Sequence, residues 1–547
     1  MNLKIRSADD RGIERPRPSA YTEDEKLGLL KDWLEGIDYE ILSGTDEVKV
    51  SDVIGDSRKA APGTVFLCMI GTKTDSHAFI PEVAAKGCNA FVVEKDLKEL
   101  ELPQGAGELN IIRVPSARKA MSVLAAARFG HPSRKMCMIG LTGTKGKTST
   151  SYMIKTLLEE CGRNVGVIGT NGCVIRGKHY ETRNTTPDSY ELNQRFYDMA
   201  EAGCDTVIME CSSQGFKQDR TEGLRFDYGI FLNISPDHIG PLEHADFEEY
   251  LWCKSRLLTQ SETVIINADD EHTGDVLRAA AVRGSGSDPV PPEGACERSP
   301  ELPFKKLLRF SMQDTGADLY AHDLQFEVSD SFTGTQFQTD GIIKDTFRLS
   351  IPGIFNVSNA LAVLALASGM RLPEDSVKKA LEKVHVDGRM EAVYRSRRLT
   401  VIVDYAHNEV SMVSLLDTLK AYRPGRLVVV FGCGGNRSKD RRTGMGAAAA
   451  HAADFCIFTA DNSRYEKTED IIADIEEAYL NAGGDPGSYV KIPDRRAAIR
   501  YAMEHAKNGD MVAVIGKGHE DYQEENGVRK HFLDREEILK IKDELGL

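Results

Sequence analysis

The stretch Cys137–Gly162, CMIGLTGTKGKTSTSYMIKTLLEECG, joins an apolar run to a glycine-rich loop and then to a helical pattern. The apolar run predicts a buried strand, and the part from Lys147 onward predicts a helix that ends at Gly162. The loop between them, G-T-K-G-K-T-S, is tighter than the common phosphate-binding loop G-x-x-x-x-G-K-[ST]. Its strand–loop–helix context is nevertheless the one that a phosphate cradle needs.

This loop predicts an ATP site. Backbone N–H groups and the helix N-terminus would bind phosphate oxygens, Lys147 would reach the terminal phosphates, and Thr148 would ligate Mg²⁺. The alternative is a glycine-rich turn with a surface lysine. The predicted ATP contacts in the loop are Gly143, Thr144, Lys145, Gly146, Lys147, Thr148 and Ser149.

The composition is typical of a soluble globular protein, with 547 residues, 41% hydrophobic and 28% charged, and the length predicts two to four domains. The formal net charge of -15 argues against binding to nucleic acid or to an anionic membrane. The 11 cysteines contain no C-x-x-C pair, which favours reduced thiols, and the polar N-terminus has no apolar leader. We therefore expect a cytoplasmic protein that acts on small molecules.

Alternating strand and helix patterns predict an α/β protein of three domains. A polar extension (1–26) precedes a small α/β domain (27–134), a central P-loop domain with a parallel sheet (135–384) and a C-terminal Rossmann-like domain (385–547). Several apolar runs break into polar residues at their C-terminal ends, as strands of a doubly covered parallel sheet do. Ligands bind at this end of such strands.

Three polar residues of the central domain are candidates for binding metal-bound phosphates. Glu210 ends the apolar run VIMECSS, and His238 follows another in NISPDHIG; singly, each could be a capping or structural residue. Lys254 lies seven residues after Phe247, on the apolar face of a predicted helix. Burial there would lower its pKa and let the neutral amine capture CO₂ as a carbamate, although a snorkelling lysine fits the same pattern.

These motifs together resemble the Mur ligase family, ATP-dependent enzymes that form amide bonds in peptidoglycan precursor synthesis. The family uses the short G-T-x-G-K-[ST] loop, and the resemblance extends from about Gly55 to Glu537. It is greatest for the members that add the third residue to a UDP-N-acetylmuramoyl-dipeptide. The resemblance implies ATP and Mg²⁺ as cofactors, catalytic roles for Lys147, Lys254, His238 and Glu210, and a monomer. It implies that Thr148 and Glu210 hold one Mg²⁺, and that His238 and carbamylated Lys254 hold a second.

The resemblance also implies two further groups of binding residues. In the first, which binds the UDP-muramyl-dipeptide, GDSRKAAPG and GTKTDS match residues that contact the uridine nucleotide: Gly55, Ser57, Thr72, Lys73 and Thr74. NTTPDS and CSSQGFKQDR match residues that bind the muramyl-peptide: Asn184, Thr185, Thr186, Ser212, Gln218 and Arg220. In the second, PGIFNVSNALA, DGRMEAV and VDYAHN match residues near the nucleotide: Asn356, Arg389, Asp404 and His407.

The incoming amino acid is implied by three motifs of the last domain. Members that add diaminopimelate carry Asp-Asn-Pro-Arg, and this chain has Asp461, Asn462, Ser463 and Arg464; the other matches are Arg437, Gly516 and Glu520. An arginine suits a distal carboxylate, and a glutamate suits a distal ammonium. These residues imply a ligase for meso-diaminopimelate that acts through an acyl-phosphate.

Several residues depart from the family pattern. Gln214 stands where a histidine is usual, Pro236 interrupts the usual S-R-D-H, and Ser463 replaces a proline. None of them removes a phosphate or metal contact. Two alternatives stay open: a related ligase for another amino acid, such as L-lysine, or another acceptor, and a catalytically silent nucleotide-binding protein. The silent protein would be expected to lack Lys147, Glu210, His238 or Lys254, and all four are present.

Overall fold

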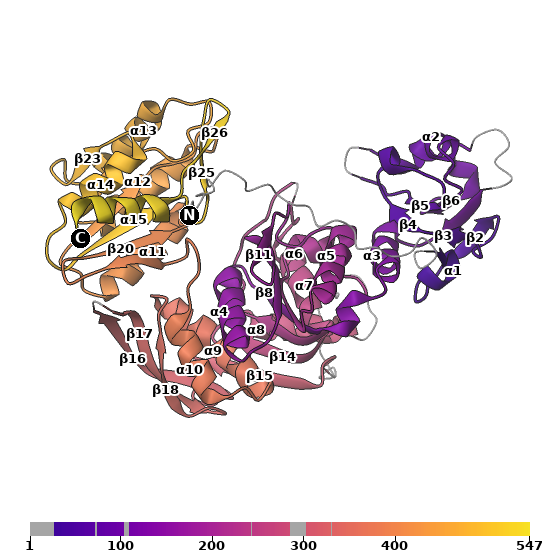
Figure 1. Cartoon of the computed structure of the whole chain (residues 1–547), viewed down its shortest axis with the longest axis horizontal. Coiled ribbons are helices and arrows are strands. Elements are labelled where there is room, and N and C mark those ends of the chain that lie inside the picture. The colour runs from indigo at the N-terminus through magenta and orange to yellow at the C-terminus, as the bar shows by residue number, and fades with distance from the viewer. Residues whose placement is uncertain (1–26, 72–73, 103–108, 242, 285–301, 330) are drawn as a thin grey trace, which may run out of the picture. The chain divides into compact units, whose positions relative to one another are not determined.

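The computed structural model describes residues 27–71, 74–102, 109–241, 243–284, 302–329 and 331–547 (Figure 1). The chain divides into two compact units. The first comprises residues 1–147, 162–266 and 270–307, and the second comprises 148–161, 267–269 and 308–547. Each unit is described by itself.

The first unit begins with a five-stranded sheet in the order β2-β7-β6-β5-β4. Strands β4 to β7 are parallel, and β2 pairs antiparallel with β7. The central strands β5 and β6 are buried along their whole length, which explains their continuous apolar sequences. The elements are β1 (Gly28–Leu29), α1 (Leu30–Trp33), β2 (Glu40–Ser43), β3 (Lys49–Val50), β4 (Asp52–Ile54), β5 (Thr64–Leu67), α2 (Ile80–Ala85), β6 (Ala90–Val93), β7 (Asn110–Arg113) and α3 (Ala117–Arg128).

A second sheet carries the glycine loop. Strands β9, β12, β8, β13 and β14 are neighbours in this order and all pair in parallel, as the sequence predicts. A hairpin, β10 and β11, extends the sheet antiparallel beyond β9 and was not predicted. The elements are β8 (Cys137–Thr142), β9 (Val165–Gly169), β10 (Gly172–Ile175), β11 (Lys178–Tyr180), α5 (Ser189–Glu201), β12 (Thr206–Glu210), α6 (Ser213–Lys217), β13 (Phe226–Phe231), α7 (Phe247–Thr259), β14 (Ser261–Asn267) and α8 (Thr273–Gly284).

The second unit contains a mostly antiparallel group of strands and a separate six-stranded sheet. The first group was not predicted, because only one face of β16 is buried and its sequence is largely polar. It consists of β15 (Lys306–Ser311), β16 (Leu319–Val328), β17 (Thr333–Gly341) and β18 (Asp345–Leu349), and is followed by α9 (Ile354–Gly369) and α10 (Glu374–Lys383). Helix α4 (Lys147–Glu160) follows the glycine loop in sequence and ends at the predicted place.

The six-stranded sheet has the order β19-β20-β24-β21-β22-β23, and only β19 is antiparallel to its neighbour. The four apolar runs predicted as strands form β20, β21, β22 and β24, so their polar C-terminal ends share one edge. The elements are β19 (Glu391–Arg395), β20 (Leu399–Asp404), α11 (Glu409–Ala421), β21 (Leu427–Phe431), α12 (Asp440–Ala452), β22 (Phe455–Phe458), α13 (Thr468–Asn481), β23 (Tyr489–Lys491), α14 (Arg495–Glu504), β24 (Asp510–Ile515), β25 (Tyr522–Glu525), β26 (Val528–His531) and α15 (Asp534–Leu545).

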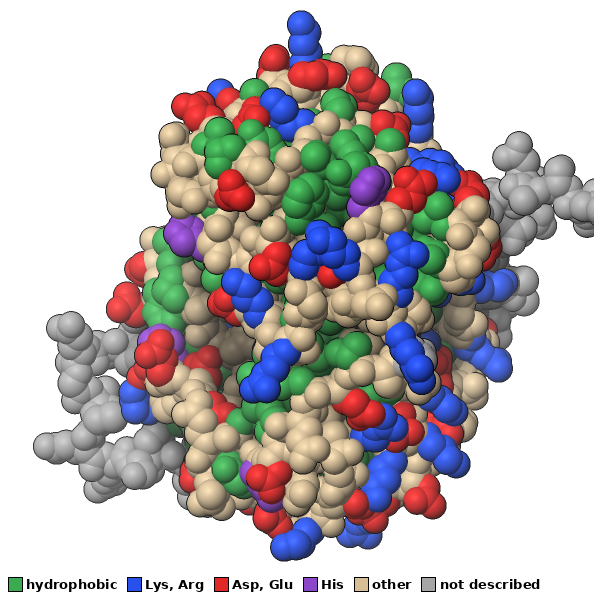
Figure 2. Space-filling model, turned by 90° about the vertical axis from the view of Figure 1, so that its left-hand side faces the viewer, with side chains coloured by type: hydrophobic (Ala, Val, Ile, Leu, Met, Phe, Trp, Pro, Cys, Tyr) green, Lys and Arg blue, Asp and Glu red, His purple; other side chains and the backbone are tan. Residues whose placement is uncertain are grey.

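The predicted α/β class with parallel sheets is confirmed, and the domain boundaries after residues 26, 134 and 384 stay a prediction. Within the described ranges, no helix combines the length and the apolar character needed to span a bilayer. Ten cysteines in the described part of the chain are free thiols, as expected. Acidic and basic side chains are interspersed on the face shown in Figure 2.

A buried ion pair holds two strand ends of the six-stranded sheet together. Arg495 and Asp534 are both fully buried, with two N–O distances of 2.7 Å. Arg495 also donates to the carbonyls of Ala460, just after β22, and of Ile515, at the end of β24, at 3.0 Å each. The pair therefore fixes the positions of the polar residues that follow these strands.

We expect Asp534→Ala to lower the free energy of unfolding by roughly 3–5 kcal/mol, because it leaves the arginine buried without its counter-charge. Urea unfolding followed by circular dichroism would measure the change. Asp543→Ala is the matched control, because the Asp543 side chain is 76% exposed, and it should change stability by less than about 0.5 kcal/mol. Equal stability of the two variants would contradict a structural role for the pair.

Candidate functional site

The glycine loop folds around its own lysine. Lys147 donates to the carbonyls of Gly143 at 2.7 Å and Thr144 at 3.3 Å, and Gly146 has φ +85°, a conformation that favours glycine. Asn233, which follows β13, accepts a hydrogen bond from the backbone N–H of Lys145 at 2.9 Å and donates to its carbonyl at 3.1 Å. Thr148 and Ser149 are buried at the start of α4. The loop thus has the fixed backbone that a phosphate cradle requires.

Lys254 of α7 is buried, as its position on the apolar face predicts, with 1% of its surface exposed. Its Nζ donates to the carbonyl of Gly143 at 2.9 Å and lies 4.7 Å from the centre of the Tyr250 ring. Burial lowers the pKa of Lys254 well below its ordinary value, and the charge of Lys147 acts in the same direction. A buried amine with a lowered pKa is a reactive nucleophile.

His238 and Lys254 both lie beside the ring of Tyr250. The imidazole is exposed, its Nδ1 lies 2.9 Å from Glu243 Oε1, and its ring centre is 6.4 Å from that of Tyr250. The Tyr250 hydroxyl in turn lies 3.0 Å from Thr144 Oγ1 in the glycine loop. The ring of Tyr250 therefore lies next to two predicted metal-binding side chains, those of His238 and Lys254.

Glu210 ends β12 and is buried. Thr170 donates to Glu210 Oε2 at 3.0 Å, and Gly169 leaves the space that the carboxylate occupies, since a Cβ there would overlap it. Thr185 Oγ1 lies 3.2 Å from Thr170 Oγ1. A predicted muramyl-peptide residue is thus two hydrogen bonds from Glu210.

Four other predicted muramyl-peptide residues, Thr186, Ser212, Gln218 and Arg220, form one cluster. Thr186 accepts from the Ser212 N–H at 2.9 Å and donates to the Glu210 carbonyl at 3.0 Å. Arg220 donates to the Thr186 carbonyl at 2.6 Å and to Gln218 Oε1 at 2.7 Å. The structure therefore brings together residues from two separate motifs, around the carboxyl end of β12.

The predicted uridine-binding residues lie in the five-stranded part of the first unit. Gly55 follows β4, and Ser57 begins a short 3-10 turn. The Ser57 carbonyl accepts a hydrogen bond from Lys86 Nζ at 3.0 Å. The Thr74 carbonyl accepts from Gly71 N at 3.0 Å. Thr72 and Lys73 lie outside the described residues.

In the second unit, the predicted nucleotide residues of DGRMEAV and VDYAHN lie close together. Asp404 accepts from the N–H groups of Met390 and Ala406 at 2.8 Å each, and burial raises the pKa of its carboxyl. Arg389 and His407 both contact the ring of Tyr405, at 4.6 Å and 4.8 Å. Asn356 is buried at the start of α9 and donates to the Pro352 carbonyl at 2.7 Å.

The predicted amino-acid residues converge at the carboxyl ends of β22 and β24. Asn462 donates to Glu520 Oε2 at 2.8 Å, and Gly516, with φ +110°, leaves room for the carboxylate of Asp461. Arg464 has φ +51° and donates to the Gly435 carbonyl at 2.6 Å. Ser463 is buried beside it.

Arg437 completes this group. A Cβ at Gly434 would lie 3.1 Å from Arg464 Nη1 and 3.8 Å from Arg437 Cγ, so the two arginines flank this glycine. The group therefore combines two arginine side chains and the Glu520 carboxylate within one loop cluster. Such a surface can read a ligand that carries both an anion and a cation.

Comparisons with known proteins show the family to which this chain belongs. The family model for the Mur ligase middle domain matches residues 141–286, and the model for the Mur ligase glutamate ligase domain matches 388–518. A relative from Clostridium perfringens, named UDP-N-acetylmuramoyl-L-alanyl-D-glutamate--2,6-diaminopimelate ligase, is 35% identical over 515 residues, covering 94% of this chain and 99% of its own. The chain belongs to the Mur ligase family. It is therefore a ligase.

Two further relatives of this Mur ligase carry the same name. One, from Caldanaerobacter subterraneus, is 36% identical over 496 residues, covering 90% of this chain and 95% of its own. The other is a solved structure that is 28% identical with a TM-score of 0.70, covering 95% of this chain and all of that one. The similarity thus extends over nearly the whole chain.

Four residues that contact the predicted site of this Mur ligase escaped sequence reasoning: Asn233, Thr170, Tyr250 and Tyr405. A usable signal existed for three of them. Thr170 and Tyr405 directly follow strands β9 and β20, and Asn233 lies two residues after β13. The position just after a parallel strand is where ligand-binding residues concentrate.

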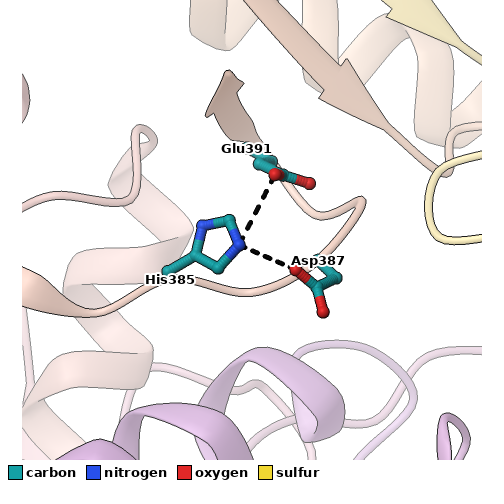
Figure 3. Close-up of side chains that lie close together, drawn as sticks. All are labelled: His385, Asp387 and Glu391. Atoms are coloured by element: carbon teal, nitrogen blue, oxygen red, sulfur yellow. Dashed lines mark hydrogen bonds and ion pairs between the residues drawn. The ribbon is translucent and has the colours of Figure 1, made fainter. Parts of the chain in front are cut away.

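A cluster of His385, Asp387 and Glu391 in the Mur ligase has the residue types of a metal site (Figure 3). His385 Nε2 lies 2.7 Å from Asp387 Oδ1 and 3.4 Å from Glu391 Oε1, and the bond to Asp387 raises the pKa of the imidazole. Arg535 of α15 lies 3.2 Å from Glu391 Oε1 and 3.4 Å from Asp387 Oδ1. Because Arg535 pairs with both carboxylates, we interpret the cluster as an ion-pair network that holds segment 385–391 to α15.

A cavity of about 500 Å³ lies elsewhere in the second unit of the Mur ligase and is lined by Arg397, Thr400, Arg423 and Met511, among others. Thr400 and Met511 lie near the amino ends of β20 and β24. The predicted nucleotide and amino-acid residues follow the carboxyl ends of the same strands. This cavity is therefore separate from the candidate site.

Proposed function

We propose that this Mur ligase joins meso-diaminopimelate to UDP-N-acetylmuramoyl-L-alanyl-D-glutamate, using ATP and an acyl-phosphate. The observation that carries the proposal is the loop cluster in which Asn462 is bonded to Glu520 while Arg464 and Arg437 flank Gly434. A distal carboxylate of the acceptor matches a guanidinium, and its distal ammonium matches a carboxylate. The names of the relatives in Clostridium and Caldanaerobacter support the same assignment.

The alternative acceptor is L-lysine, which has a distal ammonium but no distal carboxylate. An enzyme for lysine would have no need of Arg464, yet this arginine is held by the Gly435 carbonyl inside the loop cluster. Ser463, where diaminopimelate-adding members have proline, is the residue that keeps lysine open as an alternative.

The first chemical step would transfer the γ-phosphoryl group of ATP to the terminal carboxylate of the muramyl-dipeptide. Lys147, at the glycine loop, would leave its carbonyl partners and balance the negative charge that develops on the phosphates. Thr186, Ser212 and Arg220 would hold the dipeptide. The amine of the incoming amino acid would then attack the acyl-phosphate and form the amide, releasing phosphate.

Magnesium fits the donor groups that the family resemblance assigns to it. Thr148 and Glu210 would hold one ion, and His238 with a carbamate on Lys254 would hold a second; hydroxyl and carboxylate oxygens are the ligands that Mg²⁺ prefers. Glu210 is a buried carboxylate, and Lys254 is a buried amine with a lowered pKa, which suits reaction with CO₂. The bound ions would neutralise phosphate charge. Cytoplasmic location and a monomeric state stay predictions.

Phosphate release from ATP tests the proposal. The purified enzyme is incubated with UDP-N-acetylmuramoyl-L-alanyl-D-glutamate and either meso-diaminopimelate, L-lysine, L-ornithine or no amino acid. We expect release above background with meso-diaminopimelate alone. Release with L-lysine would move the assignment to the lysine-adding alternative, and no release with any amino acid would show that the muramyl substrate is wrong.

Gly169→Ala tests the role of Glu210 without replacing the glutamate itself. The added Cβ would displace Glu210, so we expect kcat to fall by about 10²-fold and the Mg²⁺ concentration for half-maximal activity to rise. Gly274→Ala in α8 is the control, because the nearest atom to its added Cβ is 3.5 Å away on the flexible side chain of Arg278. An unchanged Mg²⁺ requirement in Gly169→Ala would argue against Glu210 as a metal ligand.

A further inference from the structure

Tyr405 directly follows β20 and reaches the amino-acid cluster from there. Its hydroxyl donates to Glu520 Oε1 at 3.2 Å, across 115 residues of sequence. Burial raises the pKa of Tyr405 to about 12, and the charge of Glu520 acts in the same direction. The hydroxyl is therefore protonated at neutral pH and available as a donor.

The second carboxylate oxygen of Glu520 is held independently. Asn462 Nδ2 donates to Oε2 at 2.8 Å, while Asn462 Oδ1 accepts from the Glu524 N–H at 2.9 Å, which fixes the orientation of the amide. Lys517 Nζ lies farther away, 3.8 Å from Oε2. Because the two oxygens of a carboxylate have about four acceptor positions between them, Glu520 keeps capacity for a ligand ammonium.

The ring of Tyr405 is packed on several sides. The Arg389 guanidinium carbon lies 4.6 Å from the ring centre, and the His407 and His519 rings lie at 4.8 Å and 5.3 Å. Gly518, with φ +52°, approaches so closely that a Cβ there would lie 2.8 Å from Tyr405 Cβ. The ring is thus restrained, and the direction of its hydroxyl is set by the fold.

We propose that Tyr405 is a positioning residue that orients the Glu520 carboxylate toward the distal ammonium of the incoming diamino acid. The inference rests on the proposed function, since it takes Glu520 as the group that reads this ammonium. Without the hydroxyl, Oε1 would lose its donor and the carboxylate could rotate about its last side-chain bond. The loss of affinity would affect acceptors that carry a distal amine and would not affect acceptors that lack one.

Tyr405→Phe tests this inference with two acceptors, meso-diaminopimelate and 2-aminopimelate, which keeps the distal carboxylate and lacks the distal amine. We expect the KM for meso-diaminopimelate to rise by about 10-fold, the usual effect of losing a hydrogen bond to a charged group, with kcat within about threefold. The ratio of kcat/KM between the two acceptors should fall by a similar factor. In a Glu520→Gln background the same substitution should have no further effect on this ratio.

Tyr489→Phe is the matched control, because it removes a tyrosine hydroxyl that donates to the Glu476 carboxylate at 2.5 Å, at the edge of the sheet. Tyr489→Phe should leave the KM for meso-diaminopimelate and the ratio of kcat/KM between the two acceptors unchanged. If the wild-type enzyme uses meso-diaminopimelate and Tyr405→Phe keeps the wild-type ratio, the inference is wrong while the proposed function stands. If the wild-type enzyme does not use meso-diaminopimelate, both are wrong.

Discussion

Lys254→Ala is expected to lower kcat by about 10²–10³-fold, the range found when a group that stabilises transition-state charge is removed. The fully buried amine lies in hydrogen-bond contact with the Gly143 carbonyl of the phosphate loop, and burial lowers its pKa. Its proposed working form is a carbamate, made when the neutral amine attacks CO₂ and loses a proton. Short carboxylic acids that occupy the space left by the side chain should restore part of the activity.

Lys254→Arg separates charge from carbamate formation. Arginine stays protonated and cannot form a carbamate, so this variant should be as impaired as Lys254→Ala and should not respond to added acids. Steady-state rates with and without formate or acetate would measure both effects. Activity of Lys254→Ala within about threefold of wild type would remove the carbamate from the mechanism.

Arg464→Ala is expected to raise the KM for meso-diaminopimelate by about 10²-fold. The distal carboxylate of this acceptor would lose its charge-assisted contact and be left without a partner. Arg464→Lys should lose less, since lysine keeps the charge but not the paired N–H donors. The KM for ATP should not change. Steady-state kinetics with each substrate varied in turn would measure the KM for meso-diaminopimelate and the KM for ATP separately.

The control for Arg464 is Arg500→Ala. Arg500 pairs with Glu504 and Glu544 on the surface of α14 and α15, so its removal takes away a guanidinium without touching the loop cluster. It should leave both KM values unchanged. If Arg464→Ala bound meso-diaminopimelate as the wild type does, the acceptor assignment would have to be made from other residues.

The parts of the fold predicted from sequence are those in which local pattern and burial agree. Strands such as β8 and β21 are apolar throughout because both faces are buried, and α7 shows its buried face through the spacing of Phe247 and Lys254. The strands β16 and β17 were missed because their sequences are largely polar, and several buried positions of β17 are occupied by threonine. Hairpin β10–β11 is too short for a periodic signal.

The residues of the candidate site also divide into those that the sequence predicts and those that it does not. The glycine loop, Glu210 and the Asp461–Arg464 motif could be found because each is a short continuous pattern. The links between Tyr405 and Glu520, or between Asn233 and Lys145, join residues that are 115 and 88 positions apart in sequence. No local pattern indicates which partner such a side chain meets, and only the order of strands in the sheet determines it.

An isotope-transfer experiment tests the central claim most directly. UDP-N-acetylmuramoyl-L-alanyl-D-glutamate, labelled with ¹⁸O in its terminal carboxylate, is incubated with the enzyme, ATP, Mg²⁺ and meso-diaminopimelate, and the products are analysed by mass spectrometry. An acyl-phosphate mechanism predicts the UDP-muramyl-tripeptide together with phosphate that carries one ¹⁸O atom. Unlabelled phosphate, or no tripeptide at all, would contradict the account.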